Sequence, residues 1–385
     1  MLNYFQEVLT QTSVIYLVLD PSGKVIFVSP ALQQILGLNP AATIGKNWFE
    51  ITRNNISDQL AVKKRISDFI QSDENTLPTY VTHLQDVNQN DVHILWNTIK
   101  ASDGQLIGTG QDITQKVIQE KLITDVNNSL KEVNTYMKDS INYAARLQKA
   151  ILKNPDVLRE EFTDLSIFYR PKDVVSGDIY FYSTTKKYQY IAAIDCTGHG
   201  VPGAMLSLIA NTLLRNIIKR KGVHSVSEIL KKLDKEFINY LNENNSSYVI
   251  ADGLDIALIQ IDKAKNCYTF AGAFRPMIVL NNGVIEVVKA SKYPIGFYED
   301  VEKTFEEHKR PIVEGERIVL FSDGFPDQFG GERSKKINRI RFLEMLESID
   351  SNSGIAYEQA LRYLFEGWKG TNEQTDDVTV ISFKI

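Results

Sequence analysis

The stretch Tyr190–Gly200, YIAAIDCTGHG, decides the fold of the C-terminal part of the chain. Its apolar residues predict a buried strand that delivers Asp195 to its end. The small residues that follow turn the chain, and Pro202 suits the first turn of a helix. Glycines such as Gly198 allow the backbone to come close to a bound ion or its water molecules. We therefore predict a strand, a tight turn and a helix, with an aspartate where the strand ends.

Other aspartates occupy similar positions. Asp323 follows the apolar run Ile318–Phe321, Asp376 precedes the last apolar run, and Asp178 stands directly before a third. A single aspartate of this kind most often caps a turn, but several at strand ends are harder to explain in that way. Carboxylates that a folded sheet brings together form a site for a hard cation, and a paired site can activate water and bind a phosphoryl group. The pattern points to a metal-dependent phosphatase.

These motifs extend into a family resemblance. The segment 154–385 resembles the SpoIIE/RsbU-type branch of the PPM metal-dependent protein serine/threonine phosphatases, which are phosphoric monoester hydrolases. The stretches that carry the resemblance are PKDVVSGDIYFY, AIDCTGHGVPGAMLSLIANTLL, DGLDIALIQID, AGAFRPMIVL, YPIG, VLFSDGFPDQFGG and QTDDVTVISFKI. The resemblance implies an α-β-β-α sandwich with two Mn²⁺ or Mg²⁺ ions between its sheets. It also implies hydrolysis by a metal-activated hydroxide, with no separate organic cofactor.

The resemblance assigns the metal ligands residue by residue. Asp195 would bridge both metals, while Asp178 and the backbone carbonyl of Cys196 would hold the second metal. Asp323 and Asp376 would complete the first. The four aspartates would therefore be the catalytic residues.

Some neighbouring residues have two interpretations each. Asp377 would contact the metal ligands without binding the metal itself, since the family pattern favours Asp376 as the ligand. Asp255, in DGLDIAL, is either a weaker third metal ligand or a residue on the exposed side of its strand. Gly177 and Gly198 would let the backbone approach the ions.

The proton donor and the phosphate-binding cation are also open. His199 is a candidate acid for the leaving oxygen, although its offset from Asp195 differs from that in the eukaryotic relatives. Its alternative role is that of a polar residue at a helix start. Arg170 and Lys172 lie upstream of Asp178, and either binds phosphate or faces solvent.

The N-terminal segment, residues 1–112, predicts a small sheet with helices on one side. A strand at Ser13–Asp20, a turn and a second strand at Lys24–Ser29 form a hairpin, and a helix follows at Ala31–Leu36. The hairpin LVLDPSGKVIFVSPALQQILG, the piece IGKN and the ending GQDIT resemble a PAS sensor domain. The resemblance implies that an unknown small molecule or protein signal acts there.

The segment 113–153 predicts one long helix, because it contains no Gly or Pro. Its core positions alternate three and four residues apart, which is the spacing of a coiled coil. They are Ile123, Val126, Leu130, Val133, Met137, Ser140, Ala144, Leu147 and Ile151. The alternative is a single amphipathic helix packed on its own domain. We favour a parallel connector that makes the protein a homodimer.

Composition excludes several classes of protein and indicates the cellular compartment. The chain has 385 residues, a net charge of −5 and two cysteines, Cys196 and Cys267. The charge gives no reason to expect nucleic-acid binding, and two cysteines exclude a disulfide framework. The N-terminus lacks the charged start of a signal peptide, and no apolar run approaches membrane length. We expect a cytoplasmic α+β multidomain protein without a membrane segment.

Taken together, these features predict a signal-regulated phosphatase that acts on phosphoserine or phosphothreonine in a protein. The family resemblance suggests a small STAS-domain antagonist of a sigma-factor switch as the substrate. One alternative is a PAS-coupled, histidine-kinase-like ATP-binding protein, because DCTGHG resembles an ATP box. Against it, no His occurs between His93 and His199 to accept phosphate. Another alternative is an inactive module that binds phosphoproteins.

Overall fold

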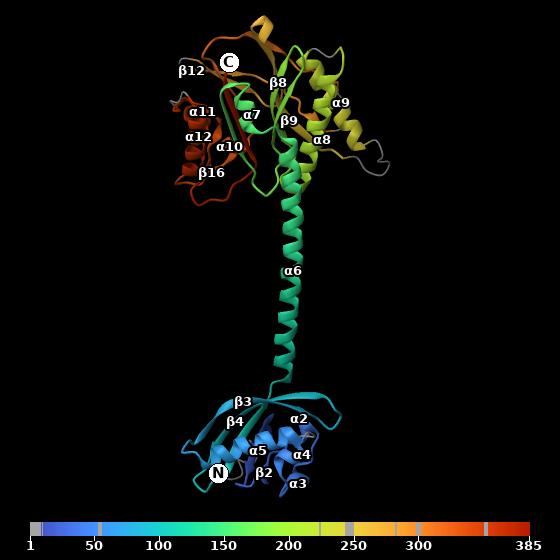
Figure 1. Cartoon of the computed structure of the whole chain (residues 1–385), viewed down its shortest axis with the longest axis vertical. Coiled ribbons are helices and arrows are strands. Elements are labelled where there is room, and N and C mark those ends of the chain that lie inside the picture. The colour runs from blue at the N-terminus through green and yellow to red at the C-terminus, as the bar shows by residue number, and fades with distance from the viewer. Residues whose placement is uncertain are drawn as a thin grey trace. The chain divides into compact units, whose positions relative to one another are not determined.

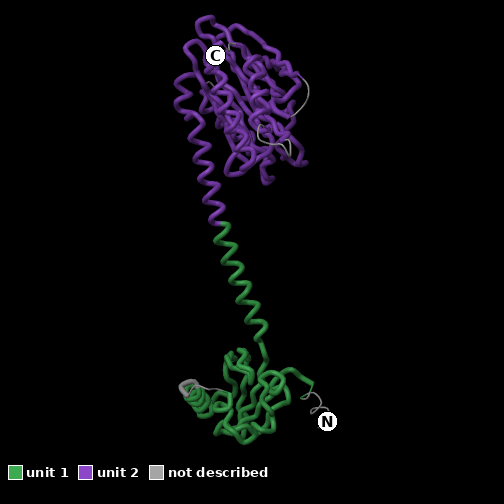
Figure 2. Tube along the Cα trace, turned by 90° about the vertical axis from the view of Figure 1, so that its right-hand side faces the viewer, with its two compact units in different colours: residues 1–134 green, residues 135–385 purple. Residues whose placement is uncertain are grey.

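The computed structural model describes residues 9, 11–52, 56–222, 225–242, 250–281, 283–297, 302–349 and 353–385. It divides into two compact units, Met1–Asn134 and Thr135–Ile385, which Figure 2 distinguishes by colour. A single helix, α6 (Thr114–Ile151), crosses the boundary between them. Each unit has its own hydrophobic core, so we describe each one separately.

The N-terminal unit is a five-stranded antiparallel sheet with strand order β2-β1-β5-β4-β3. The helix at Ala31–Leu36 ends as predicted at Gly37, whose φ of 72° is the left-handed conformation that glycine adopts readily. The strands and helices are β1 (Val14–Leu19), β2 (Val25–Val28), α2 (Ala31–Leu36), α3 (Pro40–Thr43), α4 (Trp48–Ile51), α5 (Ile56–Gln71), β3 (Thr76–Gln85), β4 (Asp91–Lys100) and β5 (Leu106–Asp112).

The C-terminal unit contains two larger antiparallel sheets. The six-stranded sheet has the order β14-β10-β9-β8-β7 with β13 beside β9, and the five-stranded sheet has the order β12-β11-β15-β18-β6. Their strands are β6 (Thr163–Arg170), β7 (Ile179–Thr184), β8 (Gln189–Cys196), β9 (Gly253–Asp262), β10 (Cys267–Ala273), β11 (Met277–Asn281), β12 (Val284–Val288), β13 (Ile295–Gly296), β14 (His308–Pro311), β15 (Arg317–Phe321) and β18 (Val378–Lys384).

Helices cover the outer face of each sheet, as Figure 1 shows. Apolar residues of α8 and α9 pack on the six-stranded sheet, and those of α10, α11 and α12 pack on the five-stranded sheet. The helices are α7 (Pro155–Arg159), α8 (Gly200–Lys219), α9 (Val226–Asn242), α10 (Gly324–Asp327), α11 (Asn338–Glu347) and α12 (Gly354–Lys369), with a short 3₁₀ turn at Lys263–Lys265 and a small hairpin of β16 (Phe329–Gly330) and β17 (Lys335–Lys336). The predicted α-β-β-α sandwich is confirmed.

Strand alternation separates three layers of core. On β8, Ile194 faces the helices, while Ile191 and Ala193 face the space between the sheets. On β15, Leu320 faces that space and Val319 faces the outer helices. Because successive side chains of a strand point to opposite faces, this alternation determines which polar side chains at the strand ends enter the space between the sheets.

One statement from the sequence needs correction. Among the described helices, α8 is long and apolar enough to cross a membrane by length and composition alone, and 50% of that stretch is buried. The expectation that no apolar run approaches membrane length was therefore wrong. The apolar residues of α8 pack on the six-stranded sheet, as those of core helices in soluble proteins do.

Candidate active site between the two sheets

Strand register brings Asp195 and Asp255 together. Ile191 and Ala193 face the space between the sheets, so Asp195, two residues further along β8, points the same way. On β9, Asp255 lies directly opposite Asp195 in the antiparallel ladder. Two carboxylates on paired strands therefore share one end of the six-stranded sheet. Asp255 is not on the solvent side of its strand, because only 15% of its side chain is exposed.

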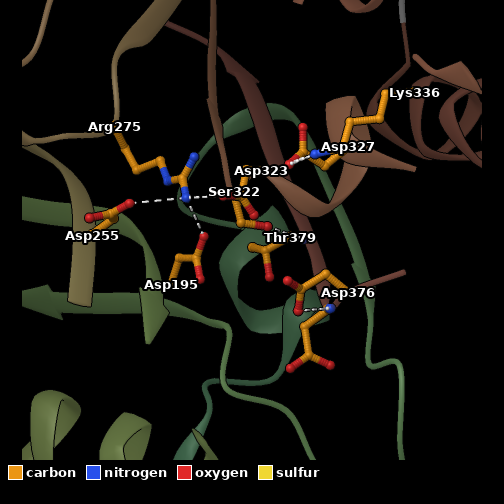
Figure 3. Close-up of polar contacts among 10 residues, drawn as sticks. Asp195, Asp255, Arg275, Ser322, Asp323, Asp327, Lys336, Asp376 and Thr379 are labelled. Carbon is orange, nitrogen blue, oxygen red and sulfur yellow. Dashed lines mark hydrogen bonds and ion pairs between the residues drawn. The ribbon is translucent and has the colours of Figure 1, made fainter. Parts of the chain in front are cut away.

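The five-stranded sheet contributes Asp323 and Asp376. Asp323 follows β15 and precedes the one-turn helix α10, and Asp376 lies two residues before β18. The two strand ends are joined reciprocally: the Thr379 amide donates to Ser322 Oγ at 2.9 Å, and the Ser322 amide donates to the Thr379 carbonyl at 2.9 Å. This pair fixes the two aspartate-bearing segments side by side, as Figure 3 shows.

The carboxylates of the two sheets meet at one guanidinium, that of Arg275. Its Nη2 lies 2.8 Å from Asp195 Oδ2, 3.0 Å from Asp255 Oδ2 and 2.5 Å from Asp323 Oδ2. Figure 3 shows the side chain reaching across from the turn after β10 to these acids. A single cationic nitrogen thus joins three acids, two from one sheet and one from the other.

The electrostatics of the cluster show that its negative charge is only partly compensated. The pKa of Asp195 is raised to about 7, chiefly by burial; Arg275 opposes this shift, while Asp323 and Asp255 add to it. Burial likewise raises the pKa of Asp255 to about 6 and that of Asp376 above its usual value. Burial alone would lower the pKa of Arg275, but the surrounding carboxylates outweigh it and raise that pKa. The site favours additional positive charge.

The surroundings of Asp178 indicate whether a cation would fit this site. Its side chain is buried, its Oδ2 has no hydrogen-bond partner, and burial followed by the charge of Asp195 raises its pKa well above the usual range. A buried, unpartnered carboxylate oxygen is costly, and a bound ion or water molecule would satisfy it. Among the described residues, no three His, Cys, Asp or Glu side chains are already arranged around a metal position. The acids converge on Arg275 instead, yet their chemistry suits a hard divalent cation.

Asp377 organises the loop before β7. Its Oδ1 accepts the Lys172 amide and its Oδ2 accepts the Gly177 amide, both at 2.7 Å. A Cβ atom on Gly177 would lie 2.4 Å from the Gly198 carbonyl oxygen and 3.3 Å from that of Cys196, so only glycine allows these backbones to meet. The Cys196 carbonyl thus lies beside the loop that carries Asp178, while the Cys196 thiol is in the outer core.

His199 belongs to a chain of polar groups at the edge of the site. Its Nδ1 is 2.8 Å from Asp173 Oδ2, and its Nε2 is 3.0 Å from Lys172 Nζ. The Lys172 charge also contributes to the environment of Asp376, where it lowers the pKa. Arg170 lies elsewhere: it pairs with Glu366 of α12 and packs over Phe365 on the outer face of its sheet.

The end of α6 contacts the same loop. Gln148 is the buried residue of that helix; its Nε2 donates to the Ser176 carbonyl at 2.6 Å and to Ser207 Oγ at 3.1 Å. Its Oε1 accepts the Ser176 amide at 3.1 Å. The connector helix is therefore hydrogen-bonded directly to Ser176, which lies two residues before Asp178 in the sequence.

Sequence reasoning overlooked three residues of this arrangement. Arg275 appears in the matched stretch AGAFRPMIVL, where a charge among apolar residues before a strand was the available signal. Asp173 stands next to Lys172, but nothing in the local sequence links it to His199. Gln148 is one polar residue among many on a polar helix.

Comparison with known proteins identifies the family to which the chain is similar. A family model described as stage II sporulation protein E (SpoIIE) matches residues 185–385, and a PAS-fold model matches residues 9–118. No curated protein matches the chain.

Among solved structures, the SiaA-PP2C domain of Pseudomonas aeruginosa is 27% identical, with a TM-score of 0.59 over 66% of this chain and 98% of that one. The Bacillus subtilis SpoIIE phosphatase with part of its regulatory domain is 13% identical, with a TM-score of 0.46 over 87% of this chain and 77% of that one. The SpoIIE match covers more than half of the sequence. This chain therefore belongs to the SpoIIE family of PPM (PP2C-type) phosphatases and carries an N-terminal PAS fold.

Proposed function

We propose that the protein is a signal-regulated phosphatase that removes phosphate from phosphoserine or phosphothreonine in a protein substrate. The observation that carries the proposal is the convergence of carboxylates from both sheets on one cation position, one of which, Asp195, interacts electrostatically with the buried Asp178, whose Oδ2 is unpartnered. Membership of the SpoIIE family supports the reaction class. It also favours the phosphatase over the ATP-binding alternative for the DCTGHG stretch.

The residues present fit two Mn²⁺ or Mg²⁺ ions. We infer that the ions are held by Asp178, Asp195, Asp323, Asp376 and the Cys196 carbonyl, with Asp255 as an additional oxygen donor. When bound, such ions supply hydroxide near neutral pH and stabilise charge on phosphoryl oxygens. The chain's own contribution is positional, because Asp377 and Gly177 hold the loop of Asp178 against the Cys196 carbonyl.

At the edge of the site, His199 and Lys172 face the substrate's leaving oxygen in our proposal. With Nδ1–H donated to Asp173, His199 Nε2 accepts a hydrogen bond from the Lys172 ammonium. Because Nε2 carries no proton in this arrangement, His199 must first take up a second proton from water; Nε2–H then gives that proton to the departing seryl oxygen, while the Lys172 ammonium attracts the phosphate. Arg170 has no such role here, because Glu366 and Phe365 occupy its guanidinium.

We propose that a homodimer forms through α6. Its exposed apolar residues include Ile123, Val126, Leu130, Val133, Met137 and Leu147, all at the predicted core positions of a coiled coil. We keep the divisions 1–112, 113–153 and 154–385 as sensor, connector and phosphatase. A signal at the sensor would reach the site through Gln148. We also propose that the protein is cytoplasmic and that its substrate is a small STAS-domain protein.

The double variant Leu130→Glu, Met137→Glu tests the dimer. Each acid would place a charge at the core of a paired helix, so we expect a monomer by light-scattering chromatography. Asn128→Glu, on the opposite face of the same helix, should leave the dimer intact. A wild-type monomer at micromolar concentration would contradict the proposed connector.

The reaction itself is tested with the full chain and a phosphoserine peptide. We expect phosphate release with Mn²⁺ or Mg²⁺ and at least about a hundredfold less with chelator. Hydrolysis of p-nitrophenyl phosphate should show the same requirement. The fragment 154–385 assayed in parallel separates a repressed enzyme from an inactive one. Silence from both proteins with both substrates and both metals would overturn the proposed function.

A further inference from the structure

Arg275 lies on a strained turn between β10 and β11. Phe274 has a φ of 64°, and the Arg275 amide donates to the Ala273 carbonyl at 2.8 Å, which closes a three-residue turn around Phe274. A bulky residue at positive φ is rare, and a turn of this kind is strained. The Phe274 amide donates to the Ser291 carbonyl at 2.9 Å and helps to hold the turn in place.

The strain has a visible result, since the turn aims the guanidinium into the carboxylate cluster. One nitrogen lies within 3.0 Å of three carboxylate oxygens, and only 12% of the Arg275 side chain is exposed. Asp195 and Asp323, the acids assigned to metal binding, are two of these three. A guanidinium nitrogen therefore occupies the place at which a divalent cation would meet the same oxygens.

We propose that Arg275 is a placeholder for the metal and the residue that then binds the substrate's phosphate. Without metal it holds the acids of the two sheets together, and a divalent cation releases it. The inference rests on the proposed function. Both cations need the same oxygens, and metal–oxygen contacts of about 2.0–2.6 Å leave the guanidinium nitrogen crowded and repelled.

The freed side chain has an evident ligand. Arg275 Nε is buried and has no hydrogen-bond partner, although a guanidinium offers five donors in a planar fork. Such a fork matches the oxygens of a phosphate monoester dianion. A side chain anchored beside the metal ligands can bind those oxygens once the carboxylates are neutralised. Metal loading and phosphate recognition would in this way be coupled through one residue.

Calorimetric titration of metal-free full-length protein with MnCl₂ tests the first half. We expect Arg275→Gln to bind Mn²⁺ about tenfold more tightly than wild type, because the competing cation is gone. Its metal-free form should melt at a lower temperature, since the acids then repel each other. Arg310→Gln, which removes a guanidinium paired with Glu286 elsewhere in the unit, should leave Mn²⁺ affinity unchanged.

Titration of the Mn²⁺-loaded proteins with inorganic phosphate tests the second half. We expect Arg275→Gln to weaken phosphate binding about tenfold or more. Arg275→Lys keeps a cation but lacks the fork, so it should hold Mn²⁺ affinity near wild type and still weaken phosphate binding. This variant keeps the test informative if Arg275→Gln does not fold.

The outcomes separate the two ideas. Unchanged or weaker Mn²⁺ binding by Arg275→Gln would overturn the placeholder, and unchanged phosphate binding by both variants would overturn the phosphate role. Absence of Mn²⁺ and Mg²⁺ binding by the wild type would instead contradict the proposed metal-dependent function.

Discussion

Asp178→Asn should lower turnover roughly 100- to 1000-fold and at the same time make the metal-free protein more stable. The two effects have one cause. The Asp178 carboxylate is buried, its Oδ2 has no partner, and its pKa is raised well above the usual range by burial and by Asp195. Such a group is unfavourable in the folded protein without a metal, and it is useful only as a ligand.

The stability gain depends on pH in a defined direction. The folded, metal-free protein keeps protons on Asp178, on Asp195 with a pKa of about 7 and on Asp255 with a pKa of about 6. The unfolded chain releases them near pH 4. Between these values the folded state binds more protons, so its stability falls as pH rises through that window. Wild type should therefore melt at a lower temperature at pH 8 than at pH 5.5.

Asn cannot ionise, so Asp178→Asn should reduce this pH dependence and raise the melting temperature at pH 8. A gain of about 1–3 kcal/mol corresponds to several degrees for a domain of this size. Thermal melts with chelator, at both pH values, measure it. Asp327→Asn, an exposed residue paired with Lys336, is the control and should change neither quantity. A destabilised Asp178→Asn protein at pH 8 would contradict this account of the site.

Gln148→Ala is expected to raise the Mn²⁺ concentration for half-maximal activity about tenfold or more. The substitution removes both hydrogen bonds to Ser176 and the one to Ser207. It leaves the buried Ser176 amide unsatisfied, at about 1–3 kcal/mol, while the Ser176 carbonyl keeps only the 3.5 Å hydrogen bond from Ser207 Oγ. Because Ser176 is two residues from Asp178, the loop should lose the position that a hard cation requires.

Metal titrations of activity in the full chain measure this effect. Lys149→Ala, the exposed neighbour on the same helix, should behave like wild type. If Gln148→Ala lowered the melting temperature but left the metal requirement unchanged, α6 would support the fold without acting on the site. A shift in metal requirement would make Gln148 the point at which a sensor signal reaches Asp178.

Local sequence patterns predicted most of the architecture. The helix α2, the strand β9 and the helix α9 begin and end at the residues expected from turns and periodicity. The edge strands β12 and β14 were missed: β12 is short and mostly half-buried or exposed, and β14 has a polar sequence. Helix α5 was missed as well, since its polar sequence has a weak apolar pattern.

The site was predictable only in part, for a physical reason. Asp195 and Asp323 could be proposed because the first lies at the end of a strand and the second just after one, which are local properties. The contact of Arg275 with both depends on a strained turn and on how two sheets pack, which no short stretch encodes. The link from His199 to Asp173 likewise joins residues 26 positions apart.

The strand order of the five-stranded sheet has a consequence for folding during synthesis. β18 is the last strand of its unit in the sequence. In the sheet, however, it lies between β15 and β6, and β6 is the first strand of the unit. β6 therefore has no partner on that side until about 200 further residues have been made. Its exposed edge would be open to pairing with other nascent chains throughout that time. Enzymatic competence would also arrive late, because Asp376 and β18 enter the sheet together.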